Sequence, residues 1–196
     1  RAVKQLGLAH VVVTSPTRDD LADGGAAFYG ATVREIRNAC PSSAVELLIP
    51  DFQGRRESME TVVASGPDII GHNVETVPRL YAIRNGADFG RSLEVIRVTG
   101  LLDPAVVTKS GIMLGMGERE EEVREVLEDL RRAGCSYLSI GQYLAPSRAH
   151  YPVKEYVPPE TIDRYREYAL SLGFLHVESG PYVRSSYLAE RYGTTK

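Results

Sequence analysis

The chain is poor in cysteine, has no long apolar run and carries no excess of positive charge. Its formal net charge is −3 over 196 residues, which excludes the basic field that nucleic acid binding requires. The longest apolar runs have strand length, as at residues 11–13, and none approaches a membrane span. No secretory signal is visible. We therefore expect a cytoplasmic protein, or a mitochondrial matrix protein in a eukaryote, without nucleic acid or membrane partners.

The two cysteines, Cys40 and Cys135, lie far apart and form no metal-ligand spacing with the four histidines. Each is interpreted as a structural or incidental thiol. Two cysteines without a secretory signal favour a reducing compartment, and a disulfide between them stays open. With 43% hydrophobic residues, the chain can bury one sizeable core.

Strand-like and helix-like segments alternate along the chain, which predicts parallel βα units. Periodicity alone does not separate a barrel from a doubly wound sheet, but in both the active residues follow the carboxyl ends of the strands. We expect a short helix ending at Gly7, strands at 10–15, 45–49, 68–72, 106–114 and 137–142, and helices at 26–39, 59–64, after Pro78, 118–133 and 159–172.

Asp23, Gly24 and Gly25 follow the first expected strand and open a helix. Glycines at this position let the backbone approach a ligand and expose amide groups at the positive end of a helix. The alternative is a plain helix-entry turn.

Asn73 and Glu75 end the third expected strand. Residues two apart in a strand point to the same face, so the amide and the carboxylate can together hold ribose hydroxyls or an ammonium group. The alternative is a capping arrangement before the helix that follows Pro78.

Lys109 and Ser110 stand in a strand that we expect to be buried. A lysine in a βα barrel strand forms a Schiff base if burial lowers its pKa. This supplies a second hypothesis, an aldolase-like enzyme without iron.

Six blocks resemble those of lipoyl synthases, in the order of that family. They include a Gly-Pro break followed by Arg184-Ser185-Ser186-Tyr187 near the end of the chain. The resemblance implies a partial, open parallel βα barrel of the radical S-adenosylmethionine type, TIM-like and without its first strand, at residues 1–174. Residues 175–196 would form an extension that carries the Arg-Ser-Ser-Tyr motif. The blocks lie at residues 14–25, 49–55, 72–81, 108–118, 141–148 and 180–187.

The resemblance also implies a reaction, the insertion of two sulfur atoms into an octanoyl chain on a lysine of a lipoyl carrier domain or H protein. One 4Fe-4S cluster would reductively cleave S-adenosylmethionine with electrons from ferredoxin or flavodoxin. A second, auxiliary 4Fe-4S cluster would supply the sulfur. We expect a monomer.

In the family, the first serine of Arg-Ser-Ser-Tyr is a ligand to the auxiliary cluster, which makes Ser185 the metal-ligand candidate. We group Ser185 with Arg184 as catalytic residues. The pattern Gly-x-Ile-x-Gly-x-x-Glu, with Met113 in place of the isoleucine, adds Gly115 to the cofactor site. The S-adenosylmethionine candidates are Asp23, Gly24, Gly25, Asn73, Glu75, Lys109, Ser110 and Gly115.

The chain departs from the family in lacking both cysteine triplets that hold the clusters. In relatives these triplets lie upstream of the position of Arg1. We therefore expect this chain to be the C-terminal two thirds of a lipoyl synthase and to be inactive by itself. A further alternative is a binding module, or degenerate homologue, that kept the barrel and lost the clusters.

Overall fold

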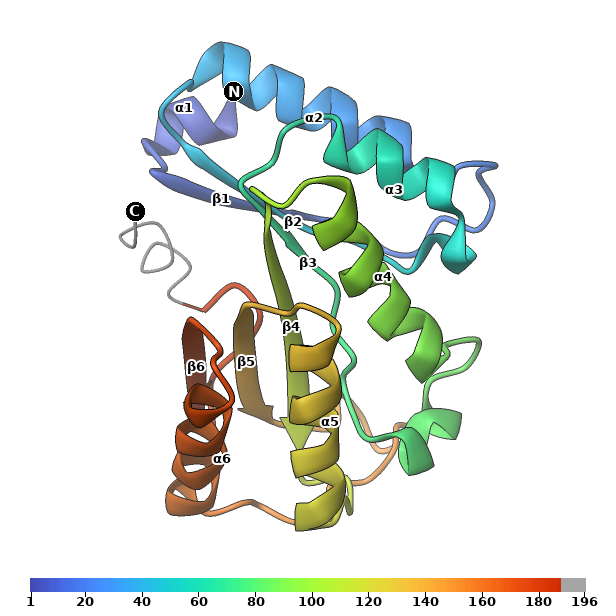
Figure 1. The fold of residues 1–196 in the computed structure, drawn as a ribbon, viewed down its shortest axis with the longest axis vertical. Helices are drawn as coiled ribbons and strands as arrows, with labels where there is room; N and C mark the ends of the chain where they lie inside the picture. The colour runs from blue at the N-terminus through green and yellow to red at the C-terminus, as the bar shows by residue number, and fades with distance from the viewer. Residues whose placement is uncertain (188–196) are drawn as a thin grey trace.

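A computed structural model describes residues 1–187 and shows a single six-stranded sheet (Figure 1). All neighbouring strands are parallel, and their order in the sheet is their order in the chain, with β1 and β6 at the two edges. This confirms the predicted α/β fold with an open sheet. The strands are β1 (His10–Thr14), β2 (Ala44–Leu48), β3 (Ile69–Gly71), β4 (Val107–Leu114), β5 (Tyr137–Gln142) and β6 (His176–Gly180).

The helices cover one face of the curved sheet, which we call the outer face (Figure 1). Alternate strand residues, such as Val11, Leu47 and Ile140, point to this face and are buried in two apolar cores. The helical elements are α1 (Ala2–Leu6), α2 (Ala26–Ala39), η1 (Phe52–Gly54), α3 (Arg56–Val63), η2 (Pro78–Ile83), α4 (Phe89–Leu102), α5 (Glu120–Arg132) and α6 (Pro159–Ser171).

Helix α5 shows how the sequence specifies these elements. Three acidic residues occupy its first turn and two arginines its last, so both ends complement the helix dipole. Glu122 accepts a hydrogen bond from the backbone N–H of Arg119 at 2.8 Å, which caps the start of the helix. The apolar residues Val126, Leu127 and Leu130 form a stripe along the side of α5 that faces the core, and all three are fully buried.

Three elements were not predicted: the single-turn helix η1, helix α4 and strand β6. Helix α4 packs between the two cores, with Val95 in one and Ile96 in the other, so its apolar residues do not form a single stripe. Its start has a signal, since the carboxylate of Asp88 accepts from the backbone N–H of Arg91 at 2.7 Å. Strand β6 is short, and its polar residues His176 and Glu178 give it a sequence that is typical of a loop.

Strand β6 lies inside the segment assigned to a C-terminal extension at 175–196. It pairs with β5 over five residues, from Tyr137 with His176 to Gly141 with Gly180. The sheet therefore continues past residue 174, and the division of the chain at that point stays a prediction. Residues 188–196 of the extension lie outside the described residues.

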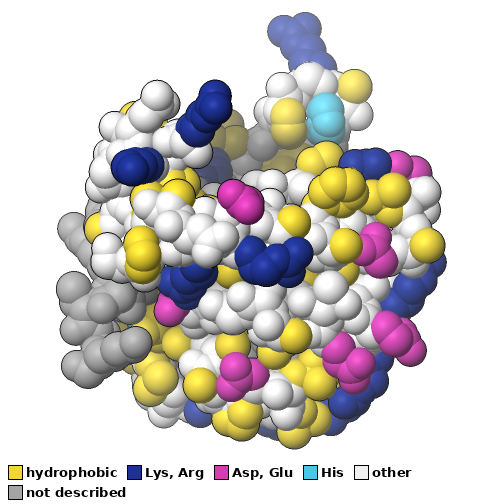
Figure 2. Space-filling view, turned by 90° about the horizontal axis from the view of Figure 1, so that it is seen from above, with side chains coloured by type: hydrophobic (Ala, Val, Ile, Leu, Met, Phe, Trp, Pro, Cys, Tyr) yellow, Lys and Arg dark blue, Asp and Glu magenta, His cyan; other side chains and the backbone are white. Residues whose placement is uncertain are grey.

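Figure 2 shows one face of the molecule, on which Lys and Arg side chains are interspersed with Asp and Glu. Apolar side chains lie between them, so this face does not carry a field of one sign. Within residues 1–187, the structure contains no helix with the length and apolar character to cross a membrane.

Candidate functional site

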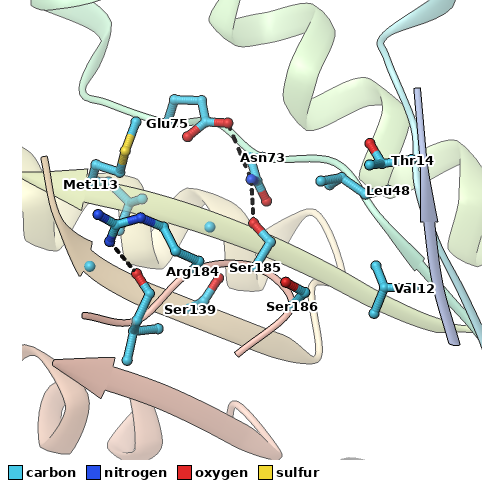
Figure 3. A pocket seen from close by; sticks show the side chains of 14 residues that line it. Val12, Thr14, Leu48, Asn73, Glu75, Met113, Ser139, Arg184, Ser185 and Ser186 are labelled. Carbon is cyan, nitrogen blue, oxygen red and sulfur yellow. Dashed lines mark hydrogen bonds between the residues drawn. The ribbon is translucent and has the colours of Figure 1, made fainter. Parts of the chain in front are cut away.

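A cavity of about 370 Å³ lies on the inner face of the sheet, opposite the helices, near the carboxyl ends of the strands (Figure 3). Strands β1, β2, β4 and β5 and the loop after β3 contribute to it, and residues 183–186, which follow β6, line it from the C-terminal segment. We call this the inner-face cavity, and residues 181–187 the tail segment. The cavity is lined by Val12, Thr14, Leu48, Asn73, Glu75, Gly111, Ile112, Met113, Ser139, Gly141, Val183, Arg184, Ser185 and Ser186.

Three of the predicted site residues meet in this cavity. Asn73 Nδ2 donates to Ser185 Oγ at 2.6 Å and to Glu75 Oε1 at 3.2 Å, so Asn73 lies between the other two side chains (Figure 3). Asn73 and Ser185 are 112 residues apart in the chain. The parallel sheet therefore brings the third strand and the tail segment to one place, as the strand-end rule predicts.

Glu75 has an unusual environment for a carboxylate. Its backbone has φ 66°, a left-handed conformation that is uncommon outside glycine. Burial raises the pKa of Glu75, while the guanidinium of Arg84 and the amide of Asn73 oppose this shift. A strained and desolvated acid at a cavity wall is typical of a binding site.

Lys109 contacts the tail segment from a buried position outside the cavity lining. Its Nζ donates to the backbone carbonyl oxygen of Ser185 at 2.6 Å and to Glu46 Oε1 at 2.7 Å. The other oxygen of Glu46 lies 3.0 Å from His10 Nε2. The side chains of Lys109 and Glu46 are each 1% exposed. Burial lowers the pKa of Lys109, and the Glu46 carboxylate opposes that shift.

The Asp23 to Gly25 turn lies outside the inner-face cavity. Asp23 accepts hydrogen bonds from the backbone N–H groups of Gly25 and Ala27 at 2.9 and 2.8 Å, and these bonds lower the pKa of Asp23. A side chain at Gly24, where φ is 63°, would meet the ring of Phe52 at 2.8 Å. The structure thus gives the turn a helix-entry role, and cofactor binding by these residues stays a prediction.

Ser110 and Gly115 also lie outside the cavity lining. Ser110 points to the outer face, where its hydroxyl donates to the backbone carbonyl oxygen of His72 at 2.9 Å. Gly115 follows β4 with φ 100°, and its N–H donates to the carboxylate of Glu118. Its carbonyl oxygen accepts from the backbone N–H of Lys154 at 2.8 Å. These contacts are structural, and the assignment of both residues to a cofactor stays a prediction.

Arg184 lines the cavity, and its Nη1 donates to the neighbouring carbonyl oxygen of Val183 at 2.7 Å. The cysteines are free thiols, and burial raises the pKa of Cys135 to about 12. Within residues 1–187, no group of three or more His, Cys, Asp or Glu side chains is arranged to hold a metal. The assignment of Ser185 as a cluster ligand stays a prediction.

Three residues at or beside the cavity were not predicted from the sequence: Glu46, Gly111 and Gly141. A single carboxylate within the apolar strand β2 is a detectable signal, because a buried charge needs a partner. Gly141 carries no local signal, whereas Gly111 is the first glycine of the Gly-x-Ile-x-Gly-x-x-Glu pattern, from which only Gly115 was assigned to the site. Added side chains at Gly111 and Gly141 would meet Asn73 Oδ1 at 2.9 Å and the carbonyl oxygen of Val183 at 2.4 Å.

The fold and this cavity define a class, parallel βα proteins of the partial-barrel type with a site at the strand ends. Solved structures share the fold at low sequence identity. Methylornithine synthase matches with TM-score 0.59 and 14% identity over 91% of this chain and 62% of its own. The HMG-CoA lyase of Brucella melitensis matches with TM-score 0.56 and 14% identity over 88% and 59%. No family model matches the chain.

Sequence relatives identify the family. The chain is 67% identical to the lipoyl synthase of Geotalea daltonii over 193 residues, which cover 98% of this chain and 66% of that protein. It is 68% identical to the lipoyl synthase of Geobacter metallireducens over 191 residues, covering 97% and 68%. The chain belongs to the lipoyl synthase family. It spans about two thirds of the length of these relatives.

Proposed function

We propose that this chain supplies the S-adenosylmethionine pocket and one auxiliary-cluster ligand of a lipoyl synthase. The complete enzyme would insert two sulfur atoms into an octanoyl chain that is attached to a lysine of a carrier protein. The observation that carries this proposal is the 2.6 Å contact between Asn73 and Ser185. It brings the predicted cofactor side chains and the predicted cluster ligand to one cavity.

The cavity suits S-adenosylmethionine in size and chemistry. Ligand pockets of small molecules typically enclose about 300–1,000 Å³, and this one encloses about 370 Å³. Glu75 offers a carboxylate to an ammonium group, and Asn73 offers both a donor and an acceptor to hydroxyl groups. Thr14, Leu48 and Met113 supply a less polar wall. Here the chain would bind and orient the cofactor and exclude water.

Ser185 suits the role of a cluster ligand that exchanges. Its hydroxyl faces the cavity, and its partner is a neutral amide that can release it. When bound, the clusters and S-adenosylmethionine would supply the radical chemistry and the sulfur. The remaining cluster ligands would be cysteines outside this chain. The guanidinium of Arg184 would favour a negatively charged oxygen on the neighbouring serine.

The Schiff-base alternative gains no support. The Lys109 amine is enclosed between Glu46 and the tail segment and does not line the cavity. A carbonyl substrate would have to displace both contacts to reach it. The family relationship likewise favours an enzyme over a binding module without clusters.

The proposed partners follow from the proposed reaction. They are an octanoylated lipoyl domain or H protein and a small electron-transfer protein, ferredoxin or flavodoxin, with the reaction placed in the cytoplasm of a bacterium. A carrier protein with an acidic surface would be attracted to arginines near the cavity, such as Arg184, and this attraction would weaken with salt.

In the complete enzyme, Asn73→Ala and Glu75→Ala should each weaken S-adenosylmethionine binding. Each change removes a polar contact that is worth on the order of 1–3 kcal/mol when buried, equivalent to about a 5- to 150-fold rise in Kd. Isothermal titration of the cluster-loaded protein measures the effect. Both clusters should still assemble, as read from iron and sulfide content.

A matched control is Asn85→Ala, which removes an exposed asparagine at a neighbouring cavity that Asn73 does not line. Its Kd should equal that of the parent. Unchanged affinity in both the Asn73 and the Glu75 variants would return these residues to the capping interpretation.

A further inference from the structure

The tail segment crosses the inner face of the sheet, and its main chain as well as its side chains makes close contacts there, since Lys109 Nζ reaches the carbonyl oxygen of Ser185 at the same 2.6 Å at which Asn73 reaches its hydroxyl. Val183 is buried, at 5% exposure, whereas its neighbours Tyr182 and Arg184 are exposed. The contacts come from β4 and β5, below the point where Asn73 meets the Ser185 hydroxyl. Contacts to the main chain of the tail segment therefore help to fix where residue 185 lies, in addition to the contact of its side chain.

Gly141, in β5, provides the first contact. A Cβ atom added at this glycine would lie 2.4 Å from the carbonyl oxygen of Val183, a separation that requires the main chain to move. Gly141 lies in a regular strand register opposite Gly180, so its backbone conformation does not demand glycine. The missing side chain is what allows the tail segment to approach the sheet.

The Lys109 amine provides the second contact, at 2.6 Å from the carbonyl oxygen of Ser185. Glu46 fixes this amine from the opposite side at 2.7 Å. An ammonium that donates to a carbonyl oxygen makes a charge-assisted hydrogen bond, which is stronger than a neutral one. Because the acceptor is a backbone atom, this contact does not depend on which side chain occupies position 185.

We propose that Gly141 and the Lys109–Glu46 pair are positioning residues that dock the tail segment, so that the residue 185 side chain faces the cavity. The inference rests on the proposed function in one respect, the role of Ser185 as a ligand. The docking contacts themselves join residues of this chain only.

Amide hydrogen exchange in the 196-residue chain tests the docking without any cluster. The N–H groups of Val183 and Tyr187, which donate to Gly180 and Arg184 at 3.1 and 2.8 Å, report on the tail segment. Gly141→Ala should accelerate exchange across residues 181–187 by about tenfold or more while amides of β4 and β5 keep parent rates.

The matched control is Gly71→Ala, another inner-face strand glycine. Its added Cβ would meet neighbouring atoms at ordinary distances, the nearest at 3.6 Å. Exchange in the tail segment of this variant should equal that of the parent. Equal tail exchange in the Gly141 and Gly71 variants would overturn the inference, as would loss of protection throughout the sheet in the Gly141 variant.

Lys109→Met tests the second contact, paired with Glu46→Gln so that no unpaired charge stays buried. The double variant should also accelerate tail exchange by about tenfold or more, with the sheet amides protected as in the parent. Lys154→Met, which alters an exposed lysine, is the control and should change nothing. Parent-like tail exchange in the double variant would contradict the role of the pair.

The two proposals fail in different ways. If tail exchange is unchanged but Ser185→Ala abolishes product in the complete enzyme, the ligand assignment stands and the docking inference is wrong. If the docking variants release the tail but Ser185→Ala has no effect, the docking inference stands and the ligand assignment is wrong.

Discussion

Ser185→Ala is expected to abolish or sharply reduce lipoyl product in the complete enzyme while cleavage of S-adenosylmethionine stays measurable. Thiolates are the usual soft ligands of cluster iron, so a serine oxygen should hold its iron less firmly. A cluster that must release sulfide benefits from such a ligand. The loss should exceed the roughly 10- to 100-fold effect typical of removing an outer-shell partner of a metal site. Mass spectrometry of the octanoylated substrate and of 5′-deoxyadenosine measures both activities.

Ser186→Ala is the matched control, because Ser186 lines the same cavity one residue further along. Asn73 donates to Ser185, which distinguishes the two serines structurally. The Ser186 variant should retain most of its product. Parent-like product from Ser185→Ala together with loss in Ser186→Ala would show that the other serine is the ligand.

Gly115→Ala should destabilise the fold by about 3 kcal/mol or more, the sum of two costs. The first is a side chain at φ 100°, in a region that favours glycine. The second is steric, since the added Cβ would lie 2.3 Å from Gln142 Nε2 and 2.4 Å from the carbonyl oxygen of Glu155. Urea unfolding of the chain followed by circular dichroism measures the change in free energy of unfolding.

Gly117→Ala separates the two costs. Gly117 has nearly the same conformation, φ 97°, but an added Cβ would meet only the flexible side chain of Lys154, at 3.5 Å. This variant should lose roughly 1–2 kcal/mol, from backbone strain alone. Equal losses in the two variants would show that close packing at Gly115 contributes nothing.

Most of the fold was predictable because its signals are local. The α5 stripe of Val126, Leu127 and Leu130 recurs with helical period, and its charged ends mark where the helix begins and ends. The predictions failed where tertiary context decides. Helix α4 packs against two cores at once. Strand β6 carries polar residues because it is an edge strand whose side chains His176 and Glu178 are only partly buried.

The candidate site was predictable in part. Asn73 and Glu75 were predicted from the two-residue period of a strand and Ser185 from the resemblance of its motif, but β3 ends at Gly71 and Glu75 has φ 66°, so both residues follow the strand. The contacts among them could not be read from the sequence, since Asn73 and Ser185 are far apart in the chain. The role of Gly141 could not be read from the sequence either. It depends on the tail segment, which packs against this glycine in the folded structure.

The ligand assignment of Ser185 is tested most directly by Mössbauer spectroscopy of the auxiliary cluster in the complete enzyme and in Ser185→Cys. If the Ser185 oxygen binds iron, the parent should show one iron site that differs from the other three. The cysteine variant should show four similar thiolate-bound sites, because its side chain replaces the hard ligand with a soft one at the same position. Identical spectra from the two proteins would contradict the assignment.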